Sequence, residues 1–279
     1  MKTVISASRR TDIPAYYLSW FMEKIREGKV VIQNPFYKKN FRTVSLVPEQ
    51  VEWIVFWSRN YSKFIKNRQF FSDFSLFFHF TIISHHPLLE KVYIPPEKSI
   101  KQMEVLISHF GSDRIIWRYD PIVCWDKKGK IQSNFNKSEF ALYCREFSMM
   151  GVKMCYFSFV TNYMKFKRRF SCQYPDQYIL TNDHPTYNLI LQKMRDISAK
   201  NDITLYSCCN DSLTGPHTKK GSCISGKTLN KLKGKKTVSE AKTPTRQDCG
   251  CTRSVDIGDY IEQPCHFGCI YCYANPVWR

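Results

Sequence analysis

The sequence contains no hydrophobic run long enough to cross a lipid bilayer. Its longest apolar stretches, residues 54–57 and 75–83, are much shorter than the roughly 20 residues that a membrane-spanning helix needs. The first residues also lack the apolar core of a secretory signal peptide, because the charged pair Arg9 and Arg10 comes too early. We therefore expect a cytoplasmic protein with no membrane association.

A glycine-rich nucleotide-binding motif is also missing. No G-x-G-x-x-G pattern follows the first expected strand, which argues against a dinucleotide-binding sheet. Extensive disorder is excluded, because 43% of the residues are hydrophobic and 15% are aromatic. The 279 residues suit one large domain, or a domain with a substantial appendage.

Acidic residues are few compared with basic ones. The chain has 24 Asp and Glu residues against 42 Lys and Arg residues, which gives a formal charge of +18. Such a charge attracts polyanions without specifying any of them. Much of the excess lies in residues 165–169 and 219–242, which also fit solvated loops. Nucleic acid or another polyanion is therefore a candidate partner on charge alone.

Predicted strands and helices alternate along most of the chain. Runs rich in β-branched and aromatic residues predict strands at residues 3–7, 29–33, 52–57, 75–82, 114–117, 153–159 and 203–207. Amphipathic patterns predict helices at residues 15–27, 97–110, 137–149 and 185–200. Repeated alternation is typical of parallel βαβ units. We therefore expect an α/β fold, with a full or partial TIM-like barrel of parallel strands.

Polar residues follow most of the predicted strands, and in a barrel of parallel strands the loops after the strands form the active face. Four charged residues at such positions are candidate catalytic residues: Arg9, Asp12, Arg118 and Asp120. Four polar residues are candidate cofactor-binding residues: Ser8, Asn34, Asn60 and Ser158. The alternative for the charged residues is that they pair with one another and only hold the loops in place.

The strand–helix alternation stops after residue 207. Residues 208–279 contain eight of the twelve cysteines and a lysine-rich stretch, and they show no convincing long helix. We predict an α/β domain at residues 1–207 and a cysteine-rich segment at residues 208–279 that caps it. Residues 226–246 are expected to form a mobile loop.

The cysteines fall into two classes by their spacing. Four are scattered among hydrophobic residues and are predicted to be buried thiols without a further role: Cys124, Cys144, Cys155 and Cys172. The other eight are dense and closely spaced. In a reducing compartment this pattern indicates metal binding rather than disulfide bonds.

The last three cysteines, Cys265, Cys269 and Cys272, have the spacing C-x-x-x-C-x-x-C. Three thiolates can bind three irons of a four-iron cluster and leave the fourth iron open to a small molecule. Gly268 allows the backbone to approach such a cluster closely. The alternative is a zinc site with His266 as the fourth ligand, but His266 directly follows Cys265, which suits a tetrahedral site poorly.

This segment resembles the cluster motif of radical S-adenosylmethionine (SAM) enzymes, because the aromatic residue Tyr271 directly precedes the third cysteine. The resemblance implies a [4Fe-4S] cluster that binds SAM and supplies a 5′-deoxyadenosyl radical. It also implies an electron donor such as flavodoxin or ferredoxin, and it makes Tyr271 a candidate cofactor-binding residue.

Two features depart from the usual radical SAM pattern. The cysteine loop lies near the end of the sequence instead of after the first strand, which implies a permuted arrangement. The Gly-Gly-Glu strand end that usually holds the SAM amino group is missing. That role then falls to the polar residues at the strand ends, and Arg9 or Arg118 is left to hold the SAM carboxylate through a bidentate pair.

Four further cysteines are predicted to complete a second, closed site: Cys208, Cys223, Cys249 and Cys251. Either an auxiliary [4Fe-4S] cluster or a structural zinc would fit four thiolates. Only one of the adjacent pair Cys208 and Cys209 is expected to be a ligand, because neighbours in a strand point to opposite faces.

The chain as a whole also resembles the bacterial family named domain of unknown function 1848. The resemblance is carried by residues 6–14 (SASRRTDIP), 34–36, 55–57, 117–122, 221–224, 249–251, 254–258 and 272–275. In that pattern Cys208, rather than Cys209, matches the cysteine that follows a strand.

These observations predict an iron–sulfur protein that acts as a radical SAM enzyme on an unidentified substrate, with nucleic acid or a nucleotide as the candidate. The alternative is a nucleic-acid-binding protein whose cysteine clusters hold structural zinc or iron–sulfur centres.

Overall fold

The computed structural model describes residues 2–34, 37, 39–243 and 248–278. These residues form two compact units, each assembled from separate stretches of the chain. Unit 1 comprises Met1–Phe80, Gln102–Ile115 and Ser222–Cys265, and unit 2 comprises Thr81–Lys101, Ile116–Gly221 and His266–Arg279. A boundary after residue 207 remains a prediction from composition.

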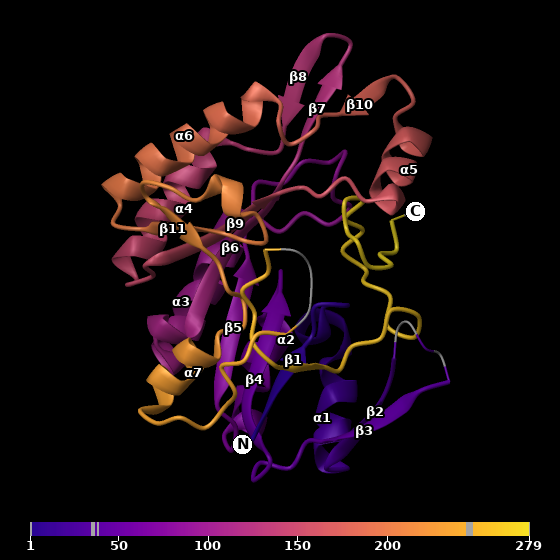
Figure 1. Cartoon of the computed structure of the whole chain (residues 1–279), viewed down its shortest axis with the longest axis vertical. Coiled ribbons are helices and arrows are strands. Elements are labelled where there is room, and N and C mark those ends of the chain that lie inside the picture. The colour runs from indigo at the N-terminus through magenta and orange to yellow at the C-terminus, as the bar shows by residue number, and fades with distance from the viewer. Residues whose placement is uncertain (1, 35–36, 38, 244–247, 279) are drawn as a thin grey trace. The chain divides into compact units, whose positions relative to one another are not determined.

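Four parallel strands form the centre of unit 1. Their order is β13 (Val255–Asp256), β1 (Thr3–Ala7), β4 (Val51–Ser58) and β5 (Leu76–Thr81). Figure 1 shows β1, β4 and β5 side by side. The strands β4 and β5 are buried along nearly their whole length, as expected of parallel strands that are covered on both faces.

Aromatic rings fill the core beside these strands. Phe21 of α1 (Leu18–Arg26) packs against Phe56 of β4 with ring centres 6.0 Å apart. Phe64 of α2 (Ser62–Lys66) lies 5.0 Å from Phe56 and 5.2 Å from Phe78 of β5. Such edge-to-face and tilted pairs add to the stabilisation that comes from burial alone.

The remaining elements of unit 1 lie around the parallel strands. They are the π-helical turn η1 (Ile13–Tyr17), the 3₁₀ turns η2 (Arg68–Phe71) and η3 (Ser112–Arg114), the hairpin of β2 (Lys29–Gln33) and β3 (Phe41–Ser45), and α7 (Gly226–Lys233). Helix α3 (Pro96–Phe110) contributes residues to both units.

Unit 2 also contains four parallel strands. Their order is β6 (Ile115–Ile122), β9 (Met154–Phe159), β11 (Thr204–Ser207) and β12 (Thr218–Lys220). A smaller antiparallel sheet has the order β10 (Gln177–Ile179), β7 (Cys124–Lys127) and β8 (Lys130–Ser133). The helical elements are α4 (Lys137–Met149), α5 (Met164–Gln173), α6 (Pro185–Lys200) and the 3₁₀ turn η4 (Asp211–Leu213).

The structure confirms an α/β fold with parallel strands, but the described residues of each unit show an open strand order and no closed barrel. The expected strand at residues 29–33 is present, yet it pairs antiparallel with β3 and lies outside the parallel set. The short connection from β2 to β3 permits a hairpin, whereas a parallel crossover needs a dozen residues or more.

Three helices were not predicted: the short α2, and α5 and α7, whose lysine content was interpreted as solvated loop. Helix α5 covers the basic stretch 165–169, and α7 occupies part of the expected mobile loop at 226–246. The end signals of α7 are present in the sequence, since Ser225 caps its first turn and Gly234 adopts a left-handed conformation after its last. Residues 244–246 of that loop lie outside the described residues.

No helix in the described part of the chain is both long enough and apolar enough to cross a membrane.

Candidate functional site

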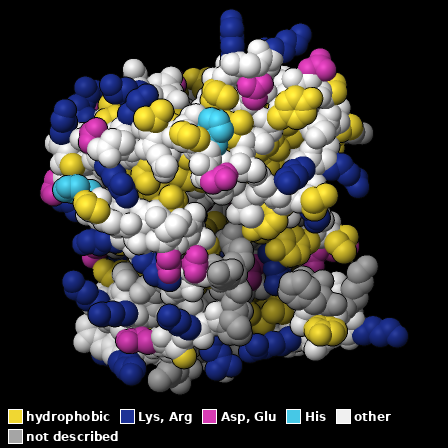
Figure 2. All heavy atoms as spheres, turned by 45° about the horizontal axis from the view of Figure 1, so that its top comes forward, with side chains coloured by type: hydrophobic (Ala, Val, Ile, Leu, Met, Phe, Trp, Pro, Cys, Tyr) yellow, Lys and Arg dark blue, Asp and Glu magenta, His cyan; other side chains and the backbone are white. Residues whose placement is uncertain are grey.

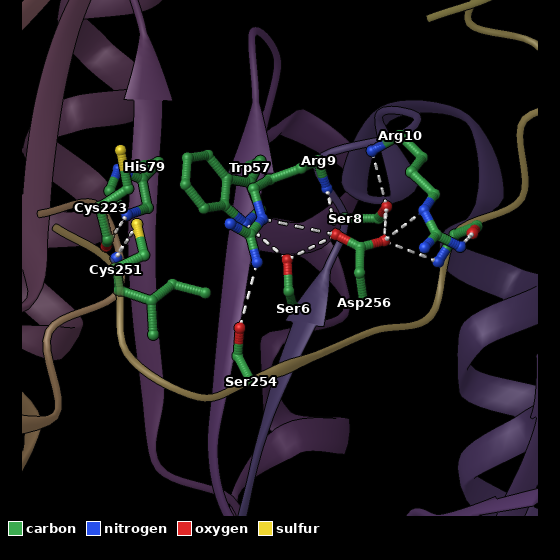
Figure 3. A network of polar contacts seen from close by, with 12 residues as sticks. Ser6, Ser8, Arg9, Arg10, Trp57, His79, Cys223, Cys251, Ser254 and Asp256 are labelled. Atoms are coloured by element: carbon green, nitrogen blue, oxygen red, sulfur yellow. Dashed lines mark hydrogen bonds and ion pairs between the residues drawn. The ribbon is translucent and has the colours of Figure 1, made fainter. Parts of the chain in front are cut away.

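The carboxylate of Asp256 organises the end of β1 in unit 1. Asp256 lies opposite Ser6 in the parallel pairing of β13 with β1. It accepts hydrogen bonds from Ser6 Oγ at 2.8 Å, Ser8 Oγ at 2.5 Å and the backbone N–H of Arg9 at 2.8 Å. Figure 3 shows these donors converging on the one carboxylate. Sequence reasoning placed Asp256 in a family pattern but gave it no role.

Two arginines surround this carboxylate. The Nε atoms of Arg9 and Arg10 lie 3.7 Å and 3.9 Å from the Asp256 oxygens. Arg9 also donates to Ser254 Oγ at 3.1 Å and lies over the ring of Trp57, and Arg10 donates to the carbonyl of Gly258 at 3.0 Å. Two guanidinium groups thus share the carboxylate of Asp256.

Gly258 is required by the close packing of the same network. A Cβ atom at this position would lie 2.1 Å from Ser8 Oγ, closer than any non-bonded contact allows. The Ser8 hydroxyl also accepts a hydrogen bond from the backbone N–H of Arg10 at 2.9 Å. Ser8 is therefore occupied with holding the loop after β1.

Asp12, a predicted catalytic residue, is buried and caps the first turn after β1. It accepts hydrogen bonds from Ser58 Oγ at 2.7 Å, Arg59 N at 2.9 Å and Ala15 N at 3.0 Å. Burial raises its pKa from 3.8 to about 6, and the hydrogen bonds oppose that shift. Asp12 thus joins the end of β1 to the end of β4.

The two predicted asparagines lie in separate local structures. Asn60 accepts a hydrogen bond from the N–H of Ser62 at 3.0 Å and so supports the start of α2. Asn34 lies in the connection of the β2–β3 hairpin, so it does not follow a strand of the parallel set. The prediction for Asn34 assumed that β2 belongs to the parallel set, and β2 pairs with β3 instead.

Three predicted residues of unit 2 meet at the ends of two neighbouring parallel strands. The Arg118 guanidinium donates to one oxygen of Asp120, and the Ser158 hydroxyl donates to the other. Arg118 and Asp120 belong to β6, and Ser158 belongs to β9, which pairs with it. The structure therefore brings these candidates together. Arg118 and Asp120 form an ion pair, as in the alternative interpretation that the charged residues pair with one another and hold the loops in place.

Three cysteines of the predicted second set gather in unit 1. Hydrogen bonds with the thiols of Cys223 and Cys249, together with burial, hold the pKa of Cys251 well above its ordinary value. The backbone N–H of Ile224 also donates to Cys251 Sγ at 3.5 Å. The fourth predicted ligand, Cys208, belongs to unit 2, where its sulfur lies 3.9 Å from that of Cys209.

A buried histidine links this thiol group to the parallel strands of unit 1. His79 of β5 is fully buried, and its Nε2 lies 2.7 Å from the carbonyl oxygen of Cys223. Its ring stacks on Trp57 of β4 with centres 3.9 Å apart and planes 5° apart. Figure 3 shows this stack between the Asp256 network and Cys223. Sequence reasoning gave His79 no role.

A single arginine holds the C-terminal cysteine loop in unit 2. Arg169 of α5 donates to the carbonyl oxygens of Ile270 at 3.2 Å, Cys272 at 2.5 Å and Ala274 at 2.9 Å. Its side chain is buried, with 8% of its surface exposed. Within the described residues Arg169 has no carboxylate partner. Burial lowers the pKa of Arg169, and the charge of Cys272 opposes that shift.

A second contact holds the same loop. The hydroxyl of Tyr271 donates to the buried carboxylate of Glu90, which also pairs with His85 Nδ1 at 3.4 Å. Gly268 has a φ of +67°, and a Cβ atom there would lie 2.5 Å from Lys91 Cβ. The loop therefore depends on a tyrosine anchor and on a glycine at one tight position.

The thiols of this loop are partly shielded from solvent. Cys269 is buried, and burial together with the neighbouring Cys269 raises the pKa of Cys272 to about 11. Cys265 belongs to unit 1, where the preceding carbonyl of Pro264 accepts a hydrogen bond from Tyr17 at 2.6 Å. No group of three or more His, Cys, Asp or Glu side chains among the described residues is arranged to hold a metal ion.

The four scattered cysteines are not all alike. Cys124, Cys144 and Cys155 are buried as predicted, whereas Cys172 is exposed. Cys172 lies near the end of α5, on a helix whose basic sequence was not recognised as helical. The prediction that Cys172 is a buried thiol is therefore wrong.

These features define a cysteine-rich α/β protein with parallel strands and a C-terminal cysteine loop. The chain belongs to the family described as Domain of unknown function (DUF1848), whose model matches residues 4–274. No curated protein and no solved structure matches the chain.

Proposed function

We propose that the chain is an iron–sulfur protein of the radical SAM type, in which Cys265, Cys269 and Cys272 hold a [4Fe-4S] cluster with one open iron. When bound, this cluster and SAM supply a 5′-deoxyadenosyl radical that removes a hydrogen atom from the substrate. The proposal includes a permuted, barrel-like arrangement of the strands and an electron donor of the flavodoxin or ferredoxin type.

The observation that carries the proposal is the buried charge of Arg169. A buried guanidinium needs several hydrogen bonds and a compensating negative charge. The acceptors of Arg169 are three neutral carbonyls, and all three belong to the cysteine loop. Thiolates in that loop would supply the missing negative charge, because a thiol that binds a metal loses its proton.

The donor set of the loop fits an iron–sulfur cluster in its chemistry. Soft thiolates are the ligands that such clusters use. A residue with a side chain at position 268 would collide with Lys91. Glycine therefore allows the backbone between Cys265 and Cys269 to keep its observed path. Burial of Cys269 would exclude water from one side of a bound cluster.

The thiol group Cys223, Cys249 and Cys251 supports a second site that holds an auxiliary cluster. These three sulfurs are already close enough to share hydrogen bonds. We propose Cys208 as the fourth ligand, as the sequence pattern implies. The contact from His79 to the Cys223 carbonyl would fix the backbone of one ligand.

Arg9 is the stronger candidate for the SAM carboxylate. It shares the carboxylate of Asp256 with Arg10 and keeps 28% of its side chain exposed. Arg118 is buried, with 8% of its side chain exposed, and pairs with Asp120. A guanidinium that retains accessible donors can form a bidentate pair with a carboxylate. The roles proposed for Ser8 and Ser158 are weaker, because both hydroxyls already donate to aspartates.

The metal content of protein purified without oxygen tests this proposal. We expect about four or about eight irons per chain, with matching sulfide. Replacing Cys269 by Ala should remove about four irons, whereas replacing the exposed Cys172 by Ala should remove none. Stoichiometric zinc without iron, or equal iron in the two variants, would contradict it.

A further inference from the structure

A hollow lined by lysines lies in unit 1 at the amino-terminal ends of β1 and β4. Its volume is about 790 Å³. Lys2 and Thr3 approach it from the start of β1, and Glu52 approaches it from the start of β4. The rest of its wall includes Glu49 and three lysines that follow or end α7: Lys233, Lys235 and Lys236.

The lysine-bearing turn after α7 is held in one shape by Asn230. The Oδ1 atom of Asn230 accepts hydrogen bonds from Thr237 N at 2.9 Å and Val238 N at 3.0 Å. Its Nδ2 atom donates to the Val238 carbonyl at 3.1 Å and to Glu240 Oε1 at 2.8 Å. Asn230 is itself buried, so this turn is a fixed feature of unit 1.

The positive charge of the hollow is only partly neutralised. Lys233 and Lys2 share the buried carboxylate of Glu52, at 3.3 Å and 3.9 Å. Lys235 and Lys236 are exposed, and neither has an acidic partner within the described residues. In the same wall the Thr237 hydroxyl is buried without a hydrogen-bond partner among those residues.

We propose that this hollow binds the phosphate backbone of a nucleic acid. Lysine ammonium groups bind phosphates as point charges, and a turn that is already fixed loses little entropy on binding. The wall is rich in charged residues, whereas pockets for small molecules are mainly apolar, so an extended polyanion suits it better. Figure 2 shows Lys and Arg side chains scattered over one face of the molecule with acidic ones among them, so the overall charge alone does not select a site.

The inference is independent of the proposed radical chemistry. The hollow lies at the amino-terminal ends of β1 and β4, whereas Ser8 and Arg9 follow the carboxyl end of β1. A nucleic acid that binds here would be held through its backbone, and its sequence would not be read. Such contacts release counterions, so each lost phosphate contact lowers the salt dependence of binding.

The test compares two double variants that remove the same charge. Lys235→Gln with Lys236→Gln alters the hollow, and Lys193→Gln with Lys200→Gln alters exposed lysines of α6. Binding of a fluorescent 20-base-pair DNA duplex is measured at several salt concentrations. The slope of log affinity against log salt is negative, with a magnitude of ~0.9 per phosphate contact. We expect the first variant, which loses two contacts, to reduce this magnitude by about 1.8. The α6 variant should keep the wild-type slope.

Equal slopes for the two variants would overturn the inference, because the effect would then come from overall charge. Melting temperatures within experimental error of the wild type would show that both variants fold. Vesicles with anionic phospholipids provide a second probe. Loss of vesicle binding in the Lys235/Lys236 variant without a change in the DNA slope would assign the hollow to a membrane surface and contradict the proposal.

Discussion

The guanidinium of Arg169 on α5 donates to the carbonyl oxygen of Cys272, more than one hundred residues later in the chain. The same group holds the carbonyls of Ile270 and Ala274, so one side chain fixes the backbone on both sides of the last cysteine. These three hydrogen bonds therefore help to set the shape of the cysteine loop.

Replacing Arg169 by Gln should loosen this loop. The variant loses the charge and most of the hydrogen bonds, and we expect the free energy of unfolding to fall by about 3 kcal/mol. Iron retention should fall with it. Arg169→Lys keeps the charge but cannot reach three carbonyls. Its stability and iron content should therefore lie between those of the wild type and those of Arg169→Gln. Urea unfolding with iron analysis measures both effects, and a Gln variant with wild-type stability and iron would contradict this role.

Asp256 should be needed for the placement of Arg9 and Arg10. In Asp256→Asn one acceptor oxygen becomes an NH₂ group that faces several donors, and we expect a loss of about 2–3 kcal/mol in stability. The exposed Asp196 on α6 offers a matched control, since Asp196→Asn should change stability by less than about 0.5 kcal/mol. Similar losses in the two variants would refute the central position of Asp256.

Asp12 should make the protein less stable as the pH rises. A salt-bridged carboxylate has the opposite effect, because its stabilisation is lost as the pH falls. Its folded pKa of about 6 lies above the ordinary 3.8, so the native state holds the proton more tightly than the unfolded state. Its contribution is therefore fully present below about pH 4 and is lost as the pH rises through 6, by about 3 kcal/mol in all.

Urea unfolding of the wild type and Asp12→Asn between pH 4 and pH 7 isolates this contribution. The difference in unfolding free energy, wild type minus variant, should fall as the pH rises, because the other groups titrate alike in both proteins. A difference that stays constant or increases with pH would show that Asp12 is not the buried, raised carboxyl described above.

Gly268 should tolerate no side chain. Gly268→Ala places an alanine in a left-handed backbone conformation and also makes its Cβ collide with Lys91. Gly234→Ala has only the conformational cost, because φ is +68° there and no atom lies within 4 Å of the new Cβ. We expect Gly234→Ala to cost about 1 kcal/mol and Gly268→Ala at least about 1 kcal/mol more. Equal costs would mean that the loop can move away from Lys91 freely.

Local patterns were enough to place several elements. The predicted helices at 137–149 and 185–200 have the observed bounds of α4 and α6. Their starts are marked by Asn136, which caps α4 through its side chain, and by Pro185 in the first turn of α6. The β2 strand was also placed correctly, but a strand pattern does not say which strand it pairs with.

The sequence could predict only those site residues that lie at the ends of neighbouring parallel strands. Arg118, Asp120 and Ser158 could be grouped because they end successive strands of a parallel set. Asp256 and Arg169 act on residues far away in the sequence, and although Asp256 lies in a family pattern, that pattern does not say what it contacts. Their roles depend on which loop is packed beside them, and no pattern in a single sequence gives that information.

Electron paramagnetic resonance of the reduced protein, before and after the addition of SAM, tests the central claim most directly. The account predicts a [4Fe-4S] signal that changes on SAM addition in the wild type and in Cys172→Ala. In Cys269→Ala this response to SAM should be lost, and any signal that remains should come from the auxiliary cluster. A cluster signal that SAM does not alter, or a protein that holds zinc and shows no signal, would contradict it.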